Sequence, residues 1–209
     1  MQDGFVTTVE KKASAILSGI AVTEGFWVVA NLRVDPQGFW RWTGFAAPRQ
    51  AGLAGWGLAL AVAAMYVLLC ARLPSVRTNL ARPSVLKVLA LLVAVAAGFC
   101  EEAVFRKLLM DALAQRGSNL AVQLFASGLA FGAVHAVWGL FRGSLAAALG
   151  AMIATGSLGF LLALVYVAGH RNLAPPVVAH FLLNLFAEPG LVLAALSGEM
   201  GRARPAASR

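Results

Sequence analysis

Long apolar stretches, separated by short polar segments, run through most of the chain. An α-helix needs about 20 apolar residues to cross a bilayer, and six stretches have roughly that length: residues 13–32, 52–73, 85–110, 120–141, 144–168 and 174–196. Glu24 interrupts the first stretch, so we expect this one to lie partly in the membrane interface. The alternation typical of barrel strands is absent. The pattern predicts an all-α fold, a polytopic transmembrane helical bundle, forming a single integral membrane domain over residues 1–209.

Composition supports a membrane protein and excludes a soluble one. Of the 209 residues, 60% are hydrophobic and 12% are charged, whereas soluble domains carry about 25% charged residues. Most of the outer surface must therefore face lipid, and a soluble enzyme or a disordered chain is excluded. The net charge of +8 comes mainly from basic residues between apolar stretches and at the chain ends, where membrane proteins keep them. We expect the lipid bilayer as a partner and no nucleic acid.

The distribution of basic residues favours both termini in the cytoplasm. The first residues lack a basic region followed by a small-residue cleavage site, so we expect no cleaved signal peptide. With the N-terminus inside, the opposite loops hold five basic residues, Arg33, Arg41, Arg49, Arg116 and Arg171. The cytoplasmic segments then hold ten, as the positive-inside rule prefers: Lys11, Lys12, Arg72, Arg77, Arg82, Lys87, Arg142, Arg202, Arg204 and Arg209.

The third apolar stretch contains charged residues that need a reason to be there. A charged side chain at the centre of a bilayer costs about 2.5–3.5 kcal/mol on insertion scales. Glu101 and Glu102 are adjacent, and Arg106 follows Glu102 by four residues. On a helix this spacing places Glu102 and Arg106 on one face, close enough to pair. Glu101 points about a hundred degrees away and is left for another partner.

Two further apolar stretches carry polar groups. His135 lies one helical turn beyond Phe131, and His180 and Asn184 have the same spacing. Polar groups inside a membrane bundle are satisfied when they converge. A glutamate can act as a general base toward water while a histidine orients or shares the proton, and His and Asn donors can stabilise an oxyanion. The combination indicates hydrolysis.

Each polar residue also has a purely structural interpretation. Glu102 and Arg106 can be a structural ion pair, His135 a hydrogen-bonded core residue, and Asn184 a hydrogen bond between helices. Other intramembrane hydrolases are excluded by their motifs: the chain has no HExxH and no GxSxG, and no serine follows a glycine by two positions. The three aspartates form no membrane-embedded pair. Glutamate and histidine remain as the candidate catalytic residue types.

Three motifs resemble those of a known family. EEAVFR (101–106), FGAVH (131–135) and HFLLN (180–184) look like the EExxxR, FxxxH and HxxxN motifs of the CPBP family, the CAAX-protease and bacteriocin-processing intramembrane endopeptidases, also called Abi. The similarity covers residues 85–188, which would be the motif-bearing catalytic core. All three motifs occur in order, each within an apolar stretch.

The resemblance implies an intramembrane glutamic endopeptidase and assigns roles to matching positions. Glu101 would activate the attacking water, assisted by His135. His180 and Asn184 would form the oxyanion site. These four residues are the predicted catalytic set.

The resemblance also implies supporting residues and leaves a metal alternative. Glu102 and Arg106 would hold the motif helix and tune Glu101, and Phe131 belongs to the same supporting set. We expect no cofactor. The alternative is a zinc-dependent peptidase, with three possible ligands: Glu101, His135 and His180.

The substrate is predicted only by class. A composition rich in Ala, Leu, Gly and Arg is typical of a GC-rich bacterium, so we expect the bacterial cytoplasmic (inner) membrane and no CAAX prenylation. The expected substrate is a membrane-associated peptide or protein, for example one with a C-terminal sorting tail. A non-catalytic membrane scaffold or immunity protein of the same family is an alternative function. A small transporter is a weaker one, because the two halves show no internal repeat.

Overall fold

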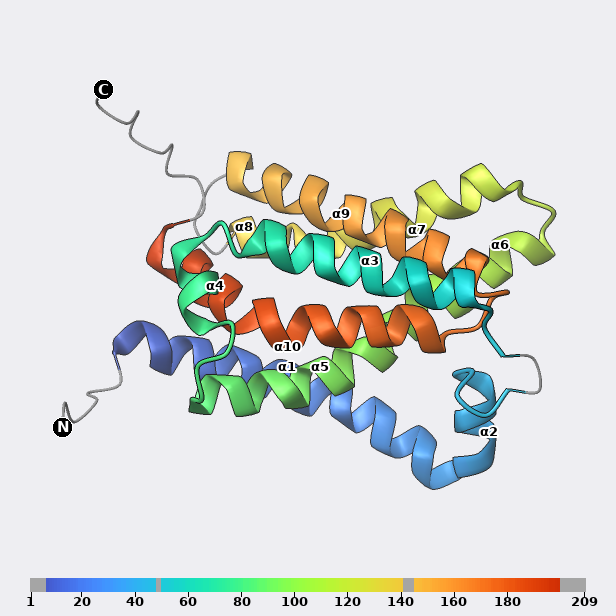
Figure 1. The fold of residues 1–209 in the computed structure, drawn as a ribbon, viewed down its shortest axis with the longest axis horizontal. Helices are drawn as coiled ribbons and strands as arrows, with labels where there is room; N and C mark the ends of the chain where they lie inside the picture. Colours follow the sequence, from blue (N-terminus) through green and yellow to red (C-terminus); the bar gives the residue numbers. More distant parts are fainter. Residues whose placement is uncertain (1–6, 48–49, 141–144, 200–209) are drawn as a thin grey trace.

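The computed structural model describes residues 7–47, 50–140 and 145–199. In this part of the chain all regular secondary structure is helical (Figure 1). In chain order the elements are α1 (Thr8–Val34), α2 (Pro36–Trp42), α3 (Leu53–Cys70), α4 (Pro74–Asn79), α5 (Val85–Glu102), the π-helix η1 (Ala103–Met110), α6 (Asp111–Gln115), α7 (Leu120–His135), α8 (Val137–Leu140), α9 (Leu145–Ala168) and α10 (Ala174–Ser197).

The predicted all-α bundle with six membrane segments is confirmed. Six helical segments of the described chain are long and apolar enough to cross a membrane: Thr8–Val34, Leu53–Cys70, Val85–Gln115, Leu120–Gly139, Leu145–Ala168 and Ala174–Ser197. The first begins five residues before the predicted start at Ala13, because Thr7 and Glu10 form a capping box at its N-terminus. The predicted boundaries at Phe141 and Ser144 lie outside the described residues.

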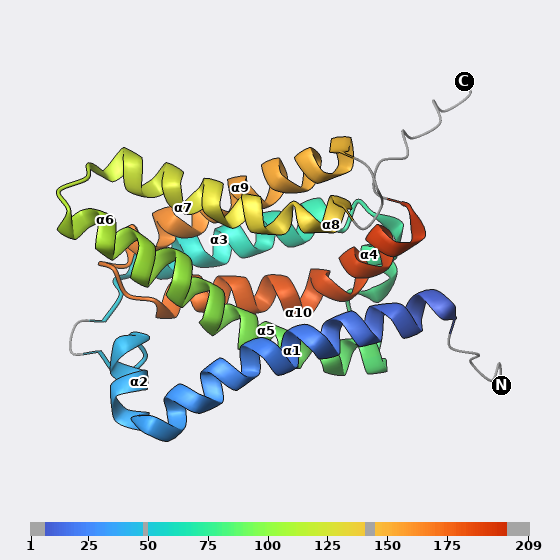
Figure 2. The same cartoon turned by 180° about the vertical axis from the view of Figure 1, so that it is seen from behind.

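Helix α10 lies at the centre of the bundle. It packs against α5 and α1 on one side and against α3 and α9 on the other, and the two opposite views agree on this arrangement (Figures 1 and 2). The long helices run alternately up and down, so that α1 begins at the same end of the bundle at which α10 ends. The start of α1 and the end of α10 on one side suit the predicted orientation, which itself stays a prediction.

Glycines allow α7 and α9 to pack at very short distance. A Cβ atom added at Gly132 of α7 would lie 2.4 Å from the carbonyl oxygen of Met152 in α9. One added at Gly159 of α9 would lie 2.8 Å from Cβ of Phe131. Small residues serve this purpose at helix contacts in membranes. The close contact fixes the position of Phe131, and with it the end of α7 that carries His135.

The third membrane segment changes its helix type at the double glutamate. The apolar pattern predicts one membrane segment from Val85 to about Met110, and within it α5 ends at Glu102 and the π-helix η1 follows directly. Its buried residues are Ala103, Phe105, Arg106 and Met110. π-Turns are rare and frequently occur at functional sites. The wider turn therefore lies directly after the residues that carry the candidate chemistry.

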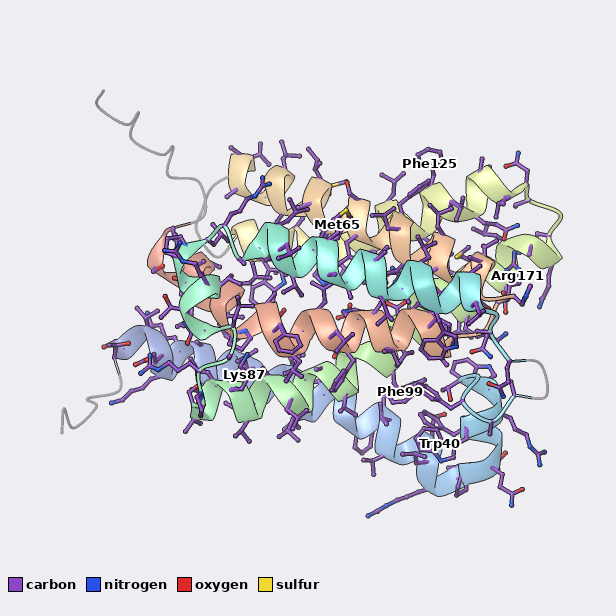
Figure 3. All side chains as sticks on the ribbon, in the orientation of Figure 1. Trp40, Met65, Lys87, Phe99, Phe125 and Arg171 are labelled. Carbon is purple, nitrogen blue, oxygen red and sulfur yellow. The ribbon has the colours of Figure 1, made fainter. Side chains whose placement is uncertain are left out.

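Lys87 compensates for a proline in the central helix. Pro189 lies inside α10 and has no N–H to donate to the carbonyl of Leu185, four residues earlier. The Lys87 ammonium donates to that carbonyl at 2.7 Å and to the carbonyl of Leu80 at 2.9 Å. Figure 3 labels Lys87 near the start of α5. One lysine thus satisfies an acceptor in α10 and also holds the segment before α5.

We expect Lys87→Met to lower the free energy of unfolding by about 1–3 kcal/mol, because it leaves the Leu185 carbonyl without a donor. Thermal or denaturant unfolding in detergent measures the loss. In a Pro189→Ala background the same substitution should cost less, since position 189 then supplies an N–H to Leu185. An equal loss in both backgrounds would contradict this explanation.

Candidate active site

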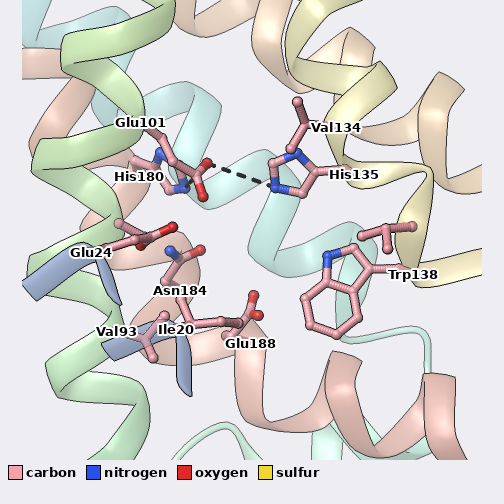
Figure 4. A pocket seen from close by; sticks show the side chains of 12 residues that line it. Ile20, Glu24, Val93, Glu101, Val134, His135, Trp138, His180, Asn184 and Glu188 are labelled. Carbon is pink, nitrogen blue, oxygen red and sulfur yellow. Dashed lines mark ion pairs between the residues drawn. The ribbon is translucent and has the colours of Figure 1, made fainter. Parts of the chain in front are cut away.

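The side chain of Glu101 faces two imidazole rings from two other helices. Its Oε2 atom lies 3.7 Å from Nε2 of His135, at the end of α7, and 3.8 Å from Nε2 of His180 in α10 (Figure 4). Glu101 and His135 are each 18% exposed at the side chain, while His180 is 4% exposed. Three helices thus bring one carboxylate and two imidazoles to a single point in the bundle.

Glu102 faces the opposite way, into the protein, and is fully buried. His180 donates through Nδ1 to Glu102 Oε1 at 2.7 Å, and Arg106 Nε lies 3.1 Å from Glu102 Oε2. The pairing of Glu102 with Arg106 was predicted from their spacing. Arg106 also donates to the carbonyl of Gly159 in α9 at 3.0 Å. The His180 ring is therefore held by a buried ionic chain that is anchored to two further helices.

The Phe131 ring contacts three polar side chains of the site. It stacks on the His135 ring with centroids 4.3 Å apart, meets the His180 ring edge-on at 5.8 Å, and lies 4.7 Å from the guanidinium carbon of Arg106. The Phe131 carbonyl accepts a hydrogen bond from His135 Nδ1 at 2.8 Å. Because a carbonyl can only accept, this proton is on Nδ1. A neutral His135 therefore presents an unprotonated Nε2 toward Glu101.

These groups border a cavity of ≈ 170 Å³, room for about five waters or for one to two side chains. The nine-tenths-buried amide of Asn184 borders it one turn beyond His180 (Figure 4). The wall comes from five helices, α1, α5, α7, α8 and α10. It consists of Ile20, Glu24, Val93, Ala97, Glu101, Val134, His135, Val137, Trp138, His180, Asn184 and Glu188.

The structure brings together every residue that the sequence singled out. The four predicted catalytic residues line the cavity, and the three supporting residues lie directly behind it. Two lining carboxylates were missed. Glu188 continues the spacing of His180 and Asn184 by one more turn, a signal that was available. Glu24 was interpreted as a weakness of the first membrane segment, whereas its side chain reaches the same cavity.

The zinc alternative has little support from the arrangement of ligand groups. Among the side chains that the structure describes, no group of three or more His, Cys, Asp and Glu has the arrangement of a metal site. The proposed trio of Glu101, His135 and His180 is therefore not a ready coordination sphere. The expectation of a cofactor-free enzyme stays a prediction.

Comparison with known protein families gives one clear result. The family model described as "Type II CAAX prenyl endopeptidase Rce1-like" matches residues 83–186. The chain belongs to the Rce1-like family. The matched region contains all three motifs and about half of the chain, and it confirms the resemblance seen in the sequence. Searches of curated proteins and of solved structures gave no match.

Rce1-like membership makes this helical bundle a membrane-embedded member of a peptidase family. Both carboxylates that the sequence analysis missed lie outside the matched region: Glu24 in α1 precedes it, and Glu188 follows it by two residues. The cavity therefore combines the family motifs with groups from the remainder of this chain.

Proposed function

We propose that the chain is an intramembrane endopeptidase that hydrolyses a peptide bond in a membrane-associated peptide or protein. The observation that carries this proposal is the position of Glu101, whose carboxylate faces both imidazole Nε2 atoms inside a cavity. An ion pair kept for packing alone would be expected to lie away from open space, as Glu102 and Arg106 do. A bacterial cytoplasmic membrane is the proposed location.

Glu101 and His135 are placed to hold the attacking water. Their facing atoms are both acceptors, 3.7 Å apart, and a water about 2.8 Å from each can donate one hydrogen to each. The lone pairs of the water oxygen then point into the cavity. Glu101 takes a proton as the water oxygen bonds to the substrate carbonyl carbon. The C–N bond breaks when the same proton passes to the leaving nitrogen.

His180 and Asn184 are placed to stabilise the negative oxygen of the tetrahedral intermediate. They lie one turn apart on α10, and both border the cavity. His180 already donates through Nδ1 to Glu102, so a protonated ring offers its second N–H to the oxyanion. The carboxylate of Glu102 stabilises such a ring. Preorganised donors of this kind contribute about 10²–10³-fold to the rate.

Chelation separates the metal-free mechanism from the zinc alternative. We expect purified protein in detergent or liposomes to keep its peptidase activity after treatment with a strong chelator. Cleavage of a membrane-protein mixture before and after treatment is the measurement. Loss of activity on chelation, with recovery on adding zinc, would contradict the proposed mechanism.

A further inference from the structure

The cavity holds more carboxylates than the proposed hydrolysis uses. Glu24 of α1 and Glu188 of α10 border the same space as Glu101 (Figure 4). No Lys or Arg is among the residues that line this cavity. The guanidinium of Arg106 lies behind it and already serves Glu102 and the carbonyl of Gly159. The open side of the site is therefore rich in carboxyl groups, and none of its lining residues is a permanent cation.

Two carboxylate oxygens of this wall, Glu24 Oε2 and Glu101 Oε2, are buried and make no hydrogen bond within the described chain. Asn184, between His180 and Glu188 along α10, is nine-tenths buried and turns its amide to the same space (Figure 4). Buried polar atoms are nearly always hydrogen-bonded, and uncompensated charges in a membrane interior usually mark a binding or transport site. The partner missing at Glu24 Oε2 is a donor, such as the N–H of a substrate cation, whereas the Asn184 amide is taken up by the proposed oxyanion.

We propose that Glu24 and Glu188 form a subsite that binds the Lys or Arg side chain of a substrate peptide. The inference rests on the proposed peptidase function and adds a specificity to it. Two carboxylates give a guanidinium or ammonium group several acceptors. Trp138 borders the same cavity as Glu188 (Figure 4), where an indole can cover the apolar stem of such a side chain.

The spacing along α10 sets where the basic residue lies in the substrate. Glu188 follows Asn184 by one turn, about 6 Å along the helix axis. An extended peptide advances about 3.3 Å per residue. If Asn184 contacts the scissile carbonyl, the basic residue therefore lies within about two residues of the cleaved bond.

Binding of a small probe tests the subsite without requiring hydrolysis. The probe is n-octylguanidinium, with the uncharged n-octylurea as its control, added to the full chain in detergent while the unfolding temperature is followed. We expect the cation to raise the unfolding temperature of the wild type and the urea to have no such effect. The Glu24→Gln/Glu188→Gln variant should bind the cation at least about tenfold more weakly, whereas Glu10→Gln, which removes a carboxylate of α1 outside the cavity, should bind it normally.

Cleavage tests the specificity. Membranes from cells that express Glu101→Gln are incubated with purified wild type or with the double variant, and new peptide termini are sequenced. We expect Lys or Arg to be enriched within about two residues of the bonds that the wild type cleaves. The enrichment should disappear with the double variant. Glu188→Lys, which places a cation beside the remaining carboxyl groups of the wall, should likewise remove the enrichment.

The two experiments separate the subsite from the peptidase. Selective binding of the cation without any cleavage would leave the cation site standing and overturn the proposed function. Cleavage without a preference for basic residues, together with equal affinity of wild type and double variant for the probe, would overturn the subsite. If the double variant fails to fold, the two single Gln variants take its place. Equal affinity of wild type and both single variants for the cation, or equal effects of cation and urea on the wild type, would then overturn the subsite.

Discussion

Arg106→Met is expected to lower the free energy of unfolding by about 3–5 kcal/mol, because it leaves a fully buried carboxylate without its cation. Glu102 and Arg106 are both 0% exposed, so water cannot replace the lost partner. The guanidinium also donates to the Gly159 carbonyl, which would be left unsatisfied. Unfolding of the purified protein in detergent measures the effect, and reduced accumulation in membranes should accompany it.

A second variant separates the stranded charge from the lost volume. Adding Glu102→Gln to Arg106→Met removes the charge and keeps an oxygen that can accept from His180 Nδ1. We expect this double variant to recover a substantial part of the stability. If the double variant is as unstable as the sum of the two single changes, the ion pair is not the source of the loss.

Glu101→Gln is expected to lower the rate of peptide hydrolysis by about 10²–10⁴-fold, the usual contribution of a general base. The amide keeps the size of the side chain but cannot accept a proton from water. Stability should change little, because Glu101 lies 3.7 and 3.8 Å from the two imidazoles and makes no closer ion pair with the residues that the structure describes. Rates are compared at equal amounts of folded protein, with Glu10→Gln as a matched control on an acidic residue outside the cavity.

The fold was accessible from the sequence because membrane helices have a strong local signal. A run of about 20 apolar residues is enough to predict a membrane helix. Most ends of the six predicted segments lie within a few residues of the ends in the structure. The pairing of Glu102 with Arg106 was accessible for the same reason, since both lie on one helix. The π-helix after Glu102 was not, because nothing in the sequence of residues 103–110 distinguishes its wider turns from those of an ordinary α-helix.

Contacts between helices were much harder to predict. Nothing in the spacing along α10 indicates that His180 Nδ1 meets Glu102 while its Nε2 faces Glu101. Glu24 lies about eighty residues before Glu101, in a helix without a recognisable motif, and only the packing of α1 on α5 brings it to the cavity. A carboxylate inside an apolar helix is itself a sign of a functional site. For Glu24 this sign was more informative than the search for a motif.

The most direct test of the central claim compares protein termini in membranes from cells that contain wild type or Glu101→Gln at matched levels. Hydrolysis at Glu101 predicts new termini that occur with the wild type and are absent with the variant, and these termini would identify the substrate. Identical termini, with the variant retaining its full biological effect, would contradict the peptidase and favour a non-catalytic scaffold.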